Sequence, residues 1–194
     1  FLTAGFPDLL EIGDQRRAGL FDLVPRKRAS LEGRVVEVDE RTDREGEIIR
    51  SPDHASVLSA ARNALAQGCR SAAVSFKNSY LNDANERAVV SLLREAGFEF
   101  VVGSGATHPF PKWLPRCESA ITEAYLNPIL RQYLDSVGKG MGAQGELLVM
   151  SSSGGLIDRD GYRAIDSLLS GPAGGVVGAG APARAAGIDQ FINL

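Results

Sequence analysis

Apolar and polar residues alternate or recur along the chain in patterns that predict short helices and strands. After a turn at residues 5–8, Leu9, Leu10 and Ile12 predict a short amphipathic helix that ends near Arg16 and Arg17. Residues 34–41 alternate valines with acidic residues, and two isoleucines follow Gly46. This second pattern predicts the two arms of a β-hairpin.

The middle of the chain repeats the order helix, strand, helix, strand. Ser51-Pro52-Asp53 predicts a helix start, with Ser51 as the cap, Pro52 in the first turn and an acidic residue beside it. The predicted helix ends at Gly68 and has an apolar stripe of Val57, Leu58, Ala61 and Leu65. Residues 72–76 and 98–102 predict buried strands, and residues 82–96 predict a second helix that ends at Gly97. Short links between these elements favour βαβ units and a largely parallel sheet.

Prolines and small residues in 103–115 predict a boundary between two lobes. From Glu118 the apolar spacing predicts a long helix, with a kink or break near Asn127 because Pro128 follows it. Residues 145–150 predict a strand that ends in the turn Ser151–Gly155, a position where open α/β sheets bind ligands. Asp158–Gly161 predicts a plain turn, and residues 188–194 predict a buried strand.

The segment 168–187 carries the clearest chemical signal in the sequence. Pro172 suits the first turn of a helix capped by Ser170 or Gly171, and Gly187 suits its end. The free backbone N–H groups of such a helix start can bind an anion. The alternative is a glycine- and alanine-rich helix that simply packs tightly on a sheet.

Composition and charge narrow the classes of function that the chain can have. The chain has 194 residues, 44% of them hydrophobic and 23% charged, which is typical of a soluble globular protein. A net charge of −3 gives no support for binding to nucleic acid or a membrane surface. The two cysteines have neither metal-ligand nor disulfide spacing, so a reducing, cytoplasmic location is expected. The sequence shows no membrane span and no signal peptide.

Common catalytic motifs do not account for the chain. It contains no Walker-type phosphate loop, and its two histidines have no zinc-ligand spacing. Residues 178–183 match a dinucleotide fingerprint only by chance, because they fall inside a predicted helix. Ser152 or Ser153 as a nucleophile lacks an evident base.

Six segments, taken in order, resemble the hydantoinase A / 5-oxoprolinase family. They are residues 5–16, 38–43, 73–80, 124–128, 150–155 and 169–175. Each segment alone is only weakly specific for this family. All six occur in the family's order across nearly the whole chain, and that ordered set is highly specific. The chain departs from the family pattern at Asn78, where the family usually has histidine, and in residues 111–116.

The resemblance implies an α/β fold with ribonuclease H-like (actin-like ATPase) lobes, in which helices flank a mixed sheet that is incomplete here. It divides the chain into residues 1–105 of an N-terminal lobe, a linker at 106–117 and residues 118–194 of the hydantoinase A lobe. The implied activity is an ATP-dependent hydrolase that couples ATP hydrolysis, with Mg²⁺, to ring opening of a cyclic amide. The family's two phosphate loops are expected outside residues 1–194, so this fragment alone is expected to be inactive.

The residues expected to line the nucleotide cleft are Ser170, Gly171, Pro172, Gly174, Gly175, Ser152, Ser153, Gly154 and Gly155. No catalytic residue and no metal ligand are assigned. Expected partners are a small cyclic amide substrate, a second hydantoinase-type subunit or domain, and another copy of the chain. Two alternatives stay open: a subunit of an ATP-dependent ketone carboxylase, and a non-catalytic module that binds a nucleotide or a partner.

Overall fold

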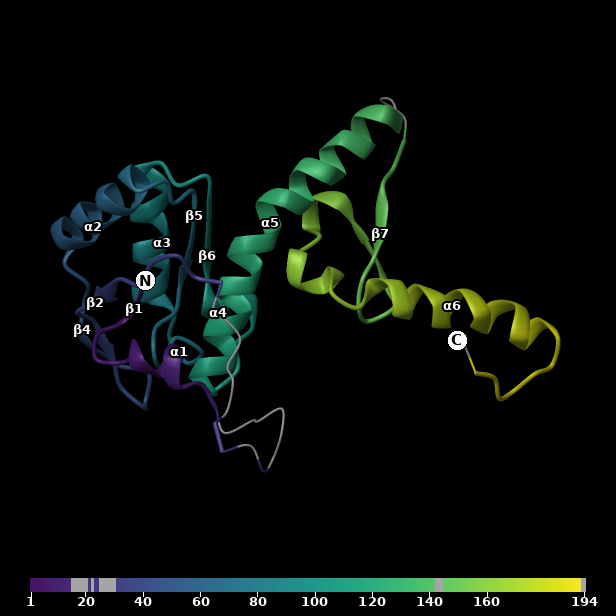
Figure 1. Cartoon of the computed structure of the whole chain (residues 1–194), viewed down its shortest axis with the longest axis horizontal. Helices are drawn as coiled ribbons and strands as arrows, with labels where there is room; N and C mark the ends of the chain where they lie inside the picture. The colour runs from purple at the N-terminus through teal and green to yellow at the C-terminus, as the bar shows by residue number, and fades with distance from the viewer. Residues whose placement is uncertain (15–20, 22, 25–30, 142–144, 193–194) are drawn as a thin grey trace. The chain divides into compact units, whose positions relative to one another are not determined.

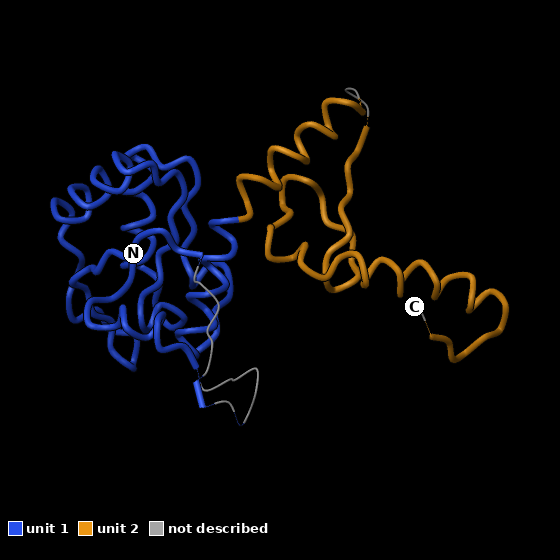
Figure 2. The backbone as a smooth tube through the Cα atoms, viewed as in Figure 1, with its two compact units in different colours: residues 1–125 blue, residues 126–194 orange. Residues whose placement is uncertain are grey.

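The computed structural model describes residues 1–14, 21, 23–24, 31–141 and 145–192 (Figure 1). They form two compact units, Phe1–Tyr125 and Leu126–Leu194 (Figure 2). The fold is mixed α/β. Within the described ranges, no helix combines the length and apolar character needed to cross a membrane.

A small parallel sheet lies at the centre of the first unit. β1 (Leu2–Thr3) pairs with β2 (Glu37–Val38), and β5 (Ser71–Val74) pairs with β6 (Phe100–Gly103), all in parallel. A parallel bridge between Leu2 and Ser75 joins the two pairs, which gives the order β2-β1-β5-β6. The carboxyl ends of all four strands therefore meet at one edge.

Helices α2 (His54–Ala66) and α3 (Ala84–Ala96) supply much of this unit's apolar core. They pack on each other, and α3 lies against β5 and β6 (Figure 1). The two predicted helices and the two predicted strands between residues 51 and 103 are confirmed. Asp53, rather than Ser51, caps α2, because its carboxylate accepts a hydrogen bond from the Ser56 N–H at 2.9 Å.

The glycine stops predicted for α2 and α3 have the required geometry. Gly68 and Gly97 adopt φ values of +90° and +106°, a region that L side chains rarely occupy. Between α3 and the next long helix, β6 runs directly into the single turn α4 (Ser104–Thr107).

The predicted hairpin has a different first arm. Its strands are β3 (Arg41–Thr42) and β4 (Ile48–Arg50), which pair antiparallel. The valine-rich segment before them pairs in parallel with β1 instead, and the Leu2 N–H donates to the Val36 carbonyl at 2.9 Å. Alternation identifies an extended segment, but it carries no information about which strand becomes its neighbour.

The predicted N-terminal helix is short. α1 runs from Asp8 to Ile12 and ends at Gly13, whose φ is +67°. Arg16 and Arg17, expected at its end, lie outside the described residues.

Helix α5 (Trp113–Met141) begins five residues before the predicted start at Glu118 and continues through Pro128 without a break. Pro115 fits the first turn, where the N–H groups of a helix have no intrahelical partner and a proline loses little. Residues of α5 up to Tyr125 belong to the first unit, and the rest belong to the second.

The second unit contains an antiparallel hairpin and a glycine-rich helix. β7 (Leu148–Met150) pairs with β8 (Leu156–Asp158), a strand that the sequence did not predict. Two 3-10 turns, η1 (Arg159–Gly161) and η2 (Ala164–Ser167), lead into α6 (Ser170–Ala185). Gly187 follows α6 with a φ of +70°, as expected for its stop.

The predicted buried strand at the end of the chain is wrong over its described part. Residues 188–192 form no strand, and Ile192 is 85% exposed. An extended segment becomes a strand only when a neighbour pairs with its N–H and C=O groups, and no described strand does so here. Residues 193–194 lie outside the described residues.

Candidate functional site

The turn Ser151–Gly155 joins two antiparallel strands. The Ser151 N–H donates to the Gly155 carbonyl at 2.8 Å, and Gly154 adopts a φ of +83°. The hydroxyl oxygens of Ser151 and Ser153 lie 2.8 Å apart. The turn was expected at the carboxyl end of a strand in a parallel sheet. That argument for ligand binding fails, because the turn closes a β-hairpin.

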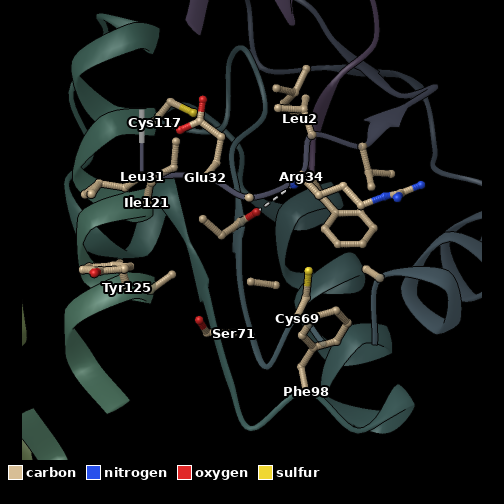
Figure 3. A pocket seen from close by; sticks show the side chains of 18 of the residues that line it. Leu2, Leu31, Glu32, Arg34, Cys69, Ser71, Phe98, Cys117, Ile121 and Tyr125 are labelled. Carbon is tan, nitrogen blue, oxygen red and sulfur yellow. Dashed lines mark hydrogen bonds between the residues drawn. The ribbon is translucent and has the colours of Figure 1, made fainter. Parts of the chain in front are cut away.

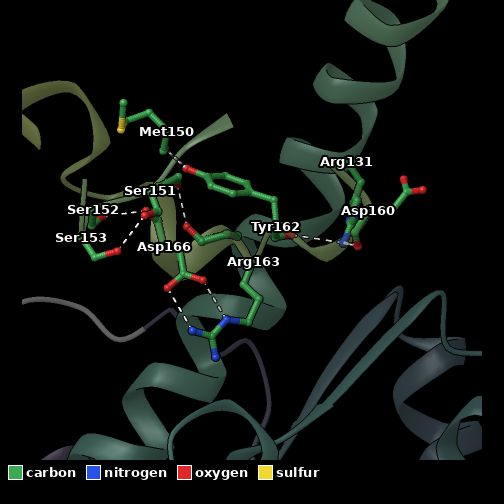
Figure 4. A network of polar contacts seen from close by, with 11 residues as sticks. Arg131, Met150, Ser151, Ser152, Ser153, Asp160, Tyr162, Arg163 and Asp166 are labelled. Atoms are coloured by element: carbon green, nitrogen blue, oxygen red, sulfur yellow. Dashed lines mark hydrogen bonds and ion pairs between the residues drawn. The ribbon is translucent and has the colours of Figure 1, made fainter. Parts of the chain in front are cut away.

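Ser152 fastens this turn to the start of α6 (Figure 4). Its hydroxyl donates to the carbonyl of Asp166 at 2.7 Å and accepts from the Leu169 N–H at 2.9 Å. Its own N–H also donates to the Asp166 carbonyl, at 2.7 Å. The Ser152 side chain is therefore engaged by protein groups, and its role in this geometry is to position the helix start.

The start of α6 has no side-chain cap. Ser170, one of the two residues expected as the cap, is the first helical residue, and its hydroxyl donates to the Ser167 carbonyl at 2.9 Å. Gly171 and Pro172 follow in the first turn and are exposed. A Cβ atom built on Gly171 would meet nothing within 4 Å, so the helix start is open to an approaching group.

Glycines hold α6 close to the hairpin. A Cβ on Gly174 would lie 3.6 Å from Cγ of Met150, and a Cβ on Gly154 would lie 3.1 Å from Cγ2 of Val177. Gly175 is half-buried on the same helix. The structure thus brings together the two segments that sequence reasoning selected, 152–155 and 170–175.

Residues that the sequence did not single out support this arrangement. The Tyr162 side chain is buried, and its hydroxyl donates to the Met150 carbonyl at 2.8 Å (Figure 4). Burial raises the pKa of this phenol, and the nearby Ser170 hydroxyl acts in the opposite direction. Arg163 and Asp166 form an ion pair at 2.8 Å. Arg131 of α5 donates to the carbonyls of Arg159, Asp160 and Tyr162.

The chemistry of the α6 start is that of an anion-binding site. The dipole and free N–H groups of a helix start favour negative charge. In the part of the chain that the structure describes, no cluster of three or more His, Cys, Asp or Glu side chains could hold a metal ion. No catalytic residue can be assigned from this geometry.

A second polar cluster, missed in the sequence, lies at the carboxyl edge of the parallel sheet in the first unit. The buried carboxylate of Glu86 accepts from the Phe76 N–H at 2.8 Å, the Ser104 hydroxyl at 2.6 Å and the Gly105 N–H at 2.9 Å. Arg116 is completely buried and donates to the Ser104 hydroxyl at 3.0 Å. Burial lowers the pKa of Arg116, and the charge of Glu86 opposes that effect.

Glu40 extends this cluster. Its carboxyl group accepts a short hydrogen bond from the Thr3 hydroxyl and another, at 2.9 Å, from the Asn85 amide. Burial raises the pKa of Glu40 above its ordinary value. Glu86 and Asn85 share the helix face of Val89 and Leu93, and their place on this buried stripe is the sequence signal that could have identified them.

The first unit also contains a cavity of about 290 Å³ (Figure 3). Its lining is mostly apolar and includes Leu2, Phe98 and Ile121, with both cysteines. Burial raises the pKa of the Cys117 thiol to about 11, so this group stays protonated at neutral pH.

Fold and site define a mixed α/β protein with an uncapped, glycine-rich helix start held against a serine hairpin. Residues 1–97 match the model of the hydantoinase/oxoprolinase N-terminal region, and residues 116–194 match the hydantoinase/oxoprolinase model. The chain belongs to the hydantoinase/oxoprolinase family.

Curated relatives include 5-oxoprolinases. The chain is 36% identical over 205 residues to the 5-oxoprolinase of Saccharomyces cerevisiae and 34% identical over 204 residues to 5-oxoprolinase 1 of Arabidopsis thaliana. Both alignments cover 91% of this chain but only 16% of the relative. It is also 31% identical, over 73% of its length and 21% of the relative, to the acetone carboxylase beta subunit of Xanthobacter autotrophicus.

Solved structures agree in fold. A nucleotide-free acetone carboxylase matches with a TM-score of 0.81 and 25% identity, over 96% of this chain and 29% of that one. The ATP-dependent caprolactamase of Pseudomonas jessenii matches with a TM-score of 0.83 and 24% identity, over 97% and 29%. The chain therefore spans under a third of the solved relatives and about a sixth of the 5-oxoprolinases.

Proposed function

We propose that the chain is part of an ATP-dependent cyclic amidase of the hydantoinase/5-oxoprolinase type, an enzyme that couples ATP hydrolysis to ring opening. The observation that carries the proposal is the 36% identity to a 5-oxoprolinase across 91% of this chain. The caprolactamase with the same fold is, by its name, ATP-dependent and acts on a lactam. A cyclic amide resists hydrolysis, and transfer of a phosphoryl group from ATP would activate it.

Within this proposal, the start of α6 and the serine turn line the nucleotide cleft. Ser170, Gly171 and Pro172 offer an open helix start, Gly174 lets the helix lie close to the hairpin, and the half-buried Gly175 follows it on the same helix. Ser152 and Gly154 position that start, and the exposed Ser153 and Gly155 border it. The fit rests on the uncapped N–H groups and the empty space around Gly171. Mg²⁺ would be held mainly by the phosphates.

Gly171→Ala in the complete natural protein tests the site. An added methyl group meets no protein atom within 4 Å, so the fold should be unaffected, while a nucleotide at the helix start would collide with it. We expect ATP binding to weaken roughly tenfold, about 1.4 kcal/mol, by calorimetry. Gly178→Ala, on the same helix and equally open, is the control and should bind ATP normally. Equal ATP affinities in the two variants would show that the nucleotide does not bind at the start of α6.

A second candidate function is a subunit of an ATP-dependent ketone carboxylase. The similarity to the acetone carboxylase beta subunit and to the acetone carboxylase structure favours it. ATP turnover by the complete protein separates the two: stimulation by 5-oxoproline or hydantoins supports the amidase, and stimulation only by a ketone with bicarbonate supports the carboxylase. ATP binding without turnover under all conditions would indicate a non-catalytic module.

The same proposal includes the domain division and the partners. The two family models leave residues 98–115 unmatched, which supports a linker at 106–117 between lobes at 1–105 and 118–194. A second hydantoinase-type subunit or domain, self-association and a cytoplasmic location complete the proposal. One relative is the beta subunit of an acetone carboxylase, which supports an assembly of several chains.

A further inference from the structure

The cavity of the first unit lies between two extended segments that are both neighbours of β1. Residues 33–36 line one side of it, and Ser71–Ala73 of β5 line the other. Phe1 and Leu2 also contribute to its lining. The cavity therefore continues the path of β1 beyond its amino end.

On the β5 side, the parallel ladder with β1 is open toward the cavity. The Phe1 nitrogen donates to the Ala73 carbonyl at 2.9 Å, and the Ser75 N–H donates to the Phe1 carbonyl at 2.9 Å. In such a ladder every second residue of a strand turns its N–H and C=O toward the same neighbour. The Ala73 N–H and the Ser71 carbonyl are therefore turned toward the cavity, at positions where a strand amide is normally paired.

The segment 33–36 has matching groups on the opposite side. The Leu2 N–H donates to the Val36 carbonyl at 2.9 Å. The same alternation turns the Val36 N–H and the Arg34 carbonyl toward the cavity. The two sides together present two N–H donors and two carbonyl acceptors, in the arrangement that a strand inserted between them would use.

The two faces of the cavity are apolar. Figure 3 shows Cys117 and Ile121 of α5 on one face and Cys69 and Phe98 on the other. The Phe1 ring meets the Phe98 ring edge to face, with their centroids 6.4 Å apart. Because side chains alternate along a strand, the second residue before Phe1 would face Phe98 as Phe1 does, and the first would face α5. Both positions favour apolar side chains.

We infer that the cavity is the binding site of an extended apolar strand, formed by the residues that precede Phe1 in the complete protein and lengthen β1. The first residue before Phe1 pairs with Arg34 and Val36. The second pairs with Ser71 and Ala73. The relatives have ample chain for such a segment, since this chain spans only 16% of the 5-oxoprolinases that it matches. The strand requires neither ATP nor a substrate, so it stands or falls separately from the proposed function.

Hydrogen exchange of the complete protein tests the pairing. We expect the Val36 and Ala73 amides to exchange as slowly as the Val74 amide, which the ladder alternation turns toward β6. Exchange of both amides as fast as that of Arg44, in an exposed turn, would overturn the inference.

A cysteine introduced at the second residue before Phe1 tests which segment fills the cavity. Phe1 and the native Cys69 pack against the same core cluster, so mild oxidation should form a disulfide to Cys69 within one chain, detected by peptide mass spectrometry. The matched control is a cysteine at the first residue before Phe1, which faces α5 and should not bond to Cys69. A disulfide between two chains would assign the cavity to a second copy. That result, or the same oxidation in both variants, would overturn the inference.

Ala124→Leu in the complete protein distinguishes a filled cavity from an empty one. Ala124 is buried and lines the cavity from α5. A leucine would fill an empty cavity, whereas beside a bound strand it would be overpacked, so we expect the urea midpoint of unfolding to fall. Ser136→Leu, at an exposed position of the same helix, is the control and should leave the midpoint unchanged. An unchanged or raised midpoint in Ala124→Leu would overturn the inference.

Discussion

Arg116 is the largest side chain that is fully enclosed in the described part of the chain. A buried guanidinium is tolerated only when protein acceptors replace its water. Here the acceptors are the Ser104 hydroxyl and the carbonyls of Phe76, Lys77 and Phe110, at 2.5 to 3.0 Å. The planar guanidinium can reach all of them because its donors diverge in a fixed fork.

Arg116→Lys should therefore be costly although it conserves the charge. A lysine ammonium has three donors on one atom and cannot reach all four acceptors. We expect the free energy of unfolding to fall by about 3 kcal/mol, measured by urea denaturation with Trp113 fluorescence. The exposed control Arg62→Lys should stay within about 0.5 kcal/mol. Similar losses in both variants would show that the network does not stabilise the fold.

Glu40 makes stability depend on pH. Burial raises the pKa of its carboxyl group, Thr3, Asn85 and Arg41 act against that effect, and Glu86 adds to it. The folded state therefore binds this proton more tightly than the unfolded state does. The stabilisation is complete below the ordinary glutamate pKa of about 4.3 and is lost as the pH rises through the raised, folded value.

Glu40→Gln should remove this dependence, since an amide does not titrate. Urea unfolding of this variant, measured from pH 4 upward, should show a free energy of unfolding that changes less with pH than that of the unmodified protein. The two slopes should differ most just above about pH 4.3. Glu95→Gln, at an exposed position of α3, should leave the profile unchanged. An unchanged slope in Glu40→Gln would mean that Glu40 titrates normally.

Among the elements, local signals predicted those with a clear apolar pattern and a clear end signal. α2, α3, β5 and β6 have apolar stripes, and glycines with positive φ follow both helices. The elements that were missed or misplaced are very short strands that carry little local signal and are defined by their pairing. β2 pairs with β1, more than thirty residues away, and β8 is a three-residue strand defined only by its pairing with β7.

Gly154 is one of the residues that hold the hairpin close to α6. Gly154→Ala would place a Cβ 3.1 Å from Val177 and would strain a backbone with a φ of +83°. We expect a loss of about 1–2 kcal/mol in the free energy of unfolding, measured by far-ultraviolet circular dichroism. Gly155→Ala is the neighbouring control, because its Cβ would lie 3.8 Å from Ser151 without a positive φ. Equal stability of the two variants would contradict this contact.

At the scale of the whole molecule, the sequence predicted the α/β class and the family, but only part of the candidate sites. The turn 151–155 and the start of α6 were recognisable because glycine, serine and proline have strong local preferences. The hydrogen bond by which Ser152 joins this turn to the start of α6 could not be predicted, because it depends on the path of residues 159–169. The cluster of Glu86 and Arg116 was missed because charged residues on a helix are usually solvated, and only the folded sheet edge buries them.

The position of Arg116 has a consequence for folding during synthesis. All four strands of the parallel sheet, and both helices beside it, precede Arg116 in the chain. A ribosome releases them first, while the carbonyls of Phe76 and Lys77 still lack the guanidinium that binds them in the finished fold. The sheet can assemble early, but its carboxyl edge is completed only when the first turn of α5 emerges. Packing of this turn is therefore the last step in the folding of the first unit during synthesis.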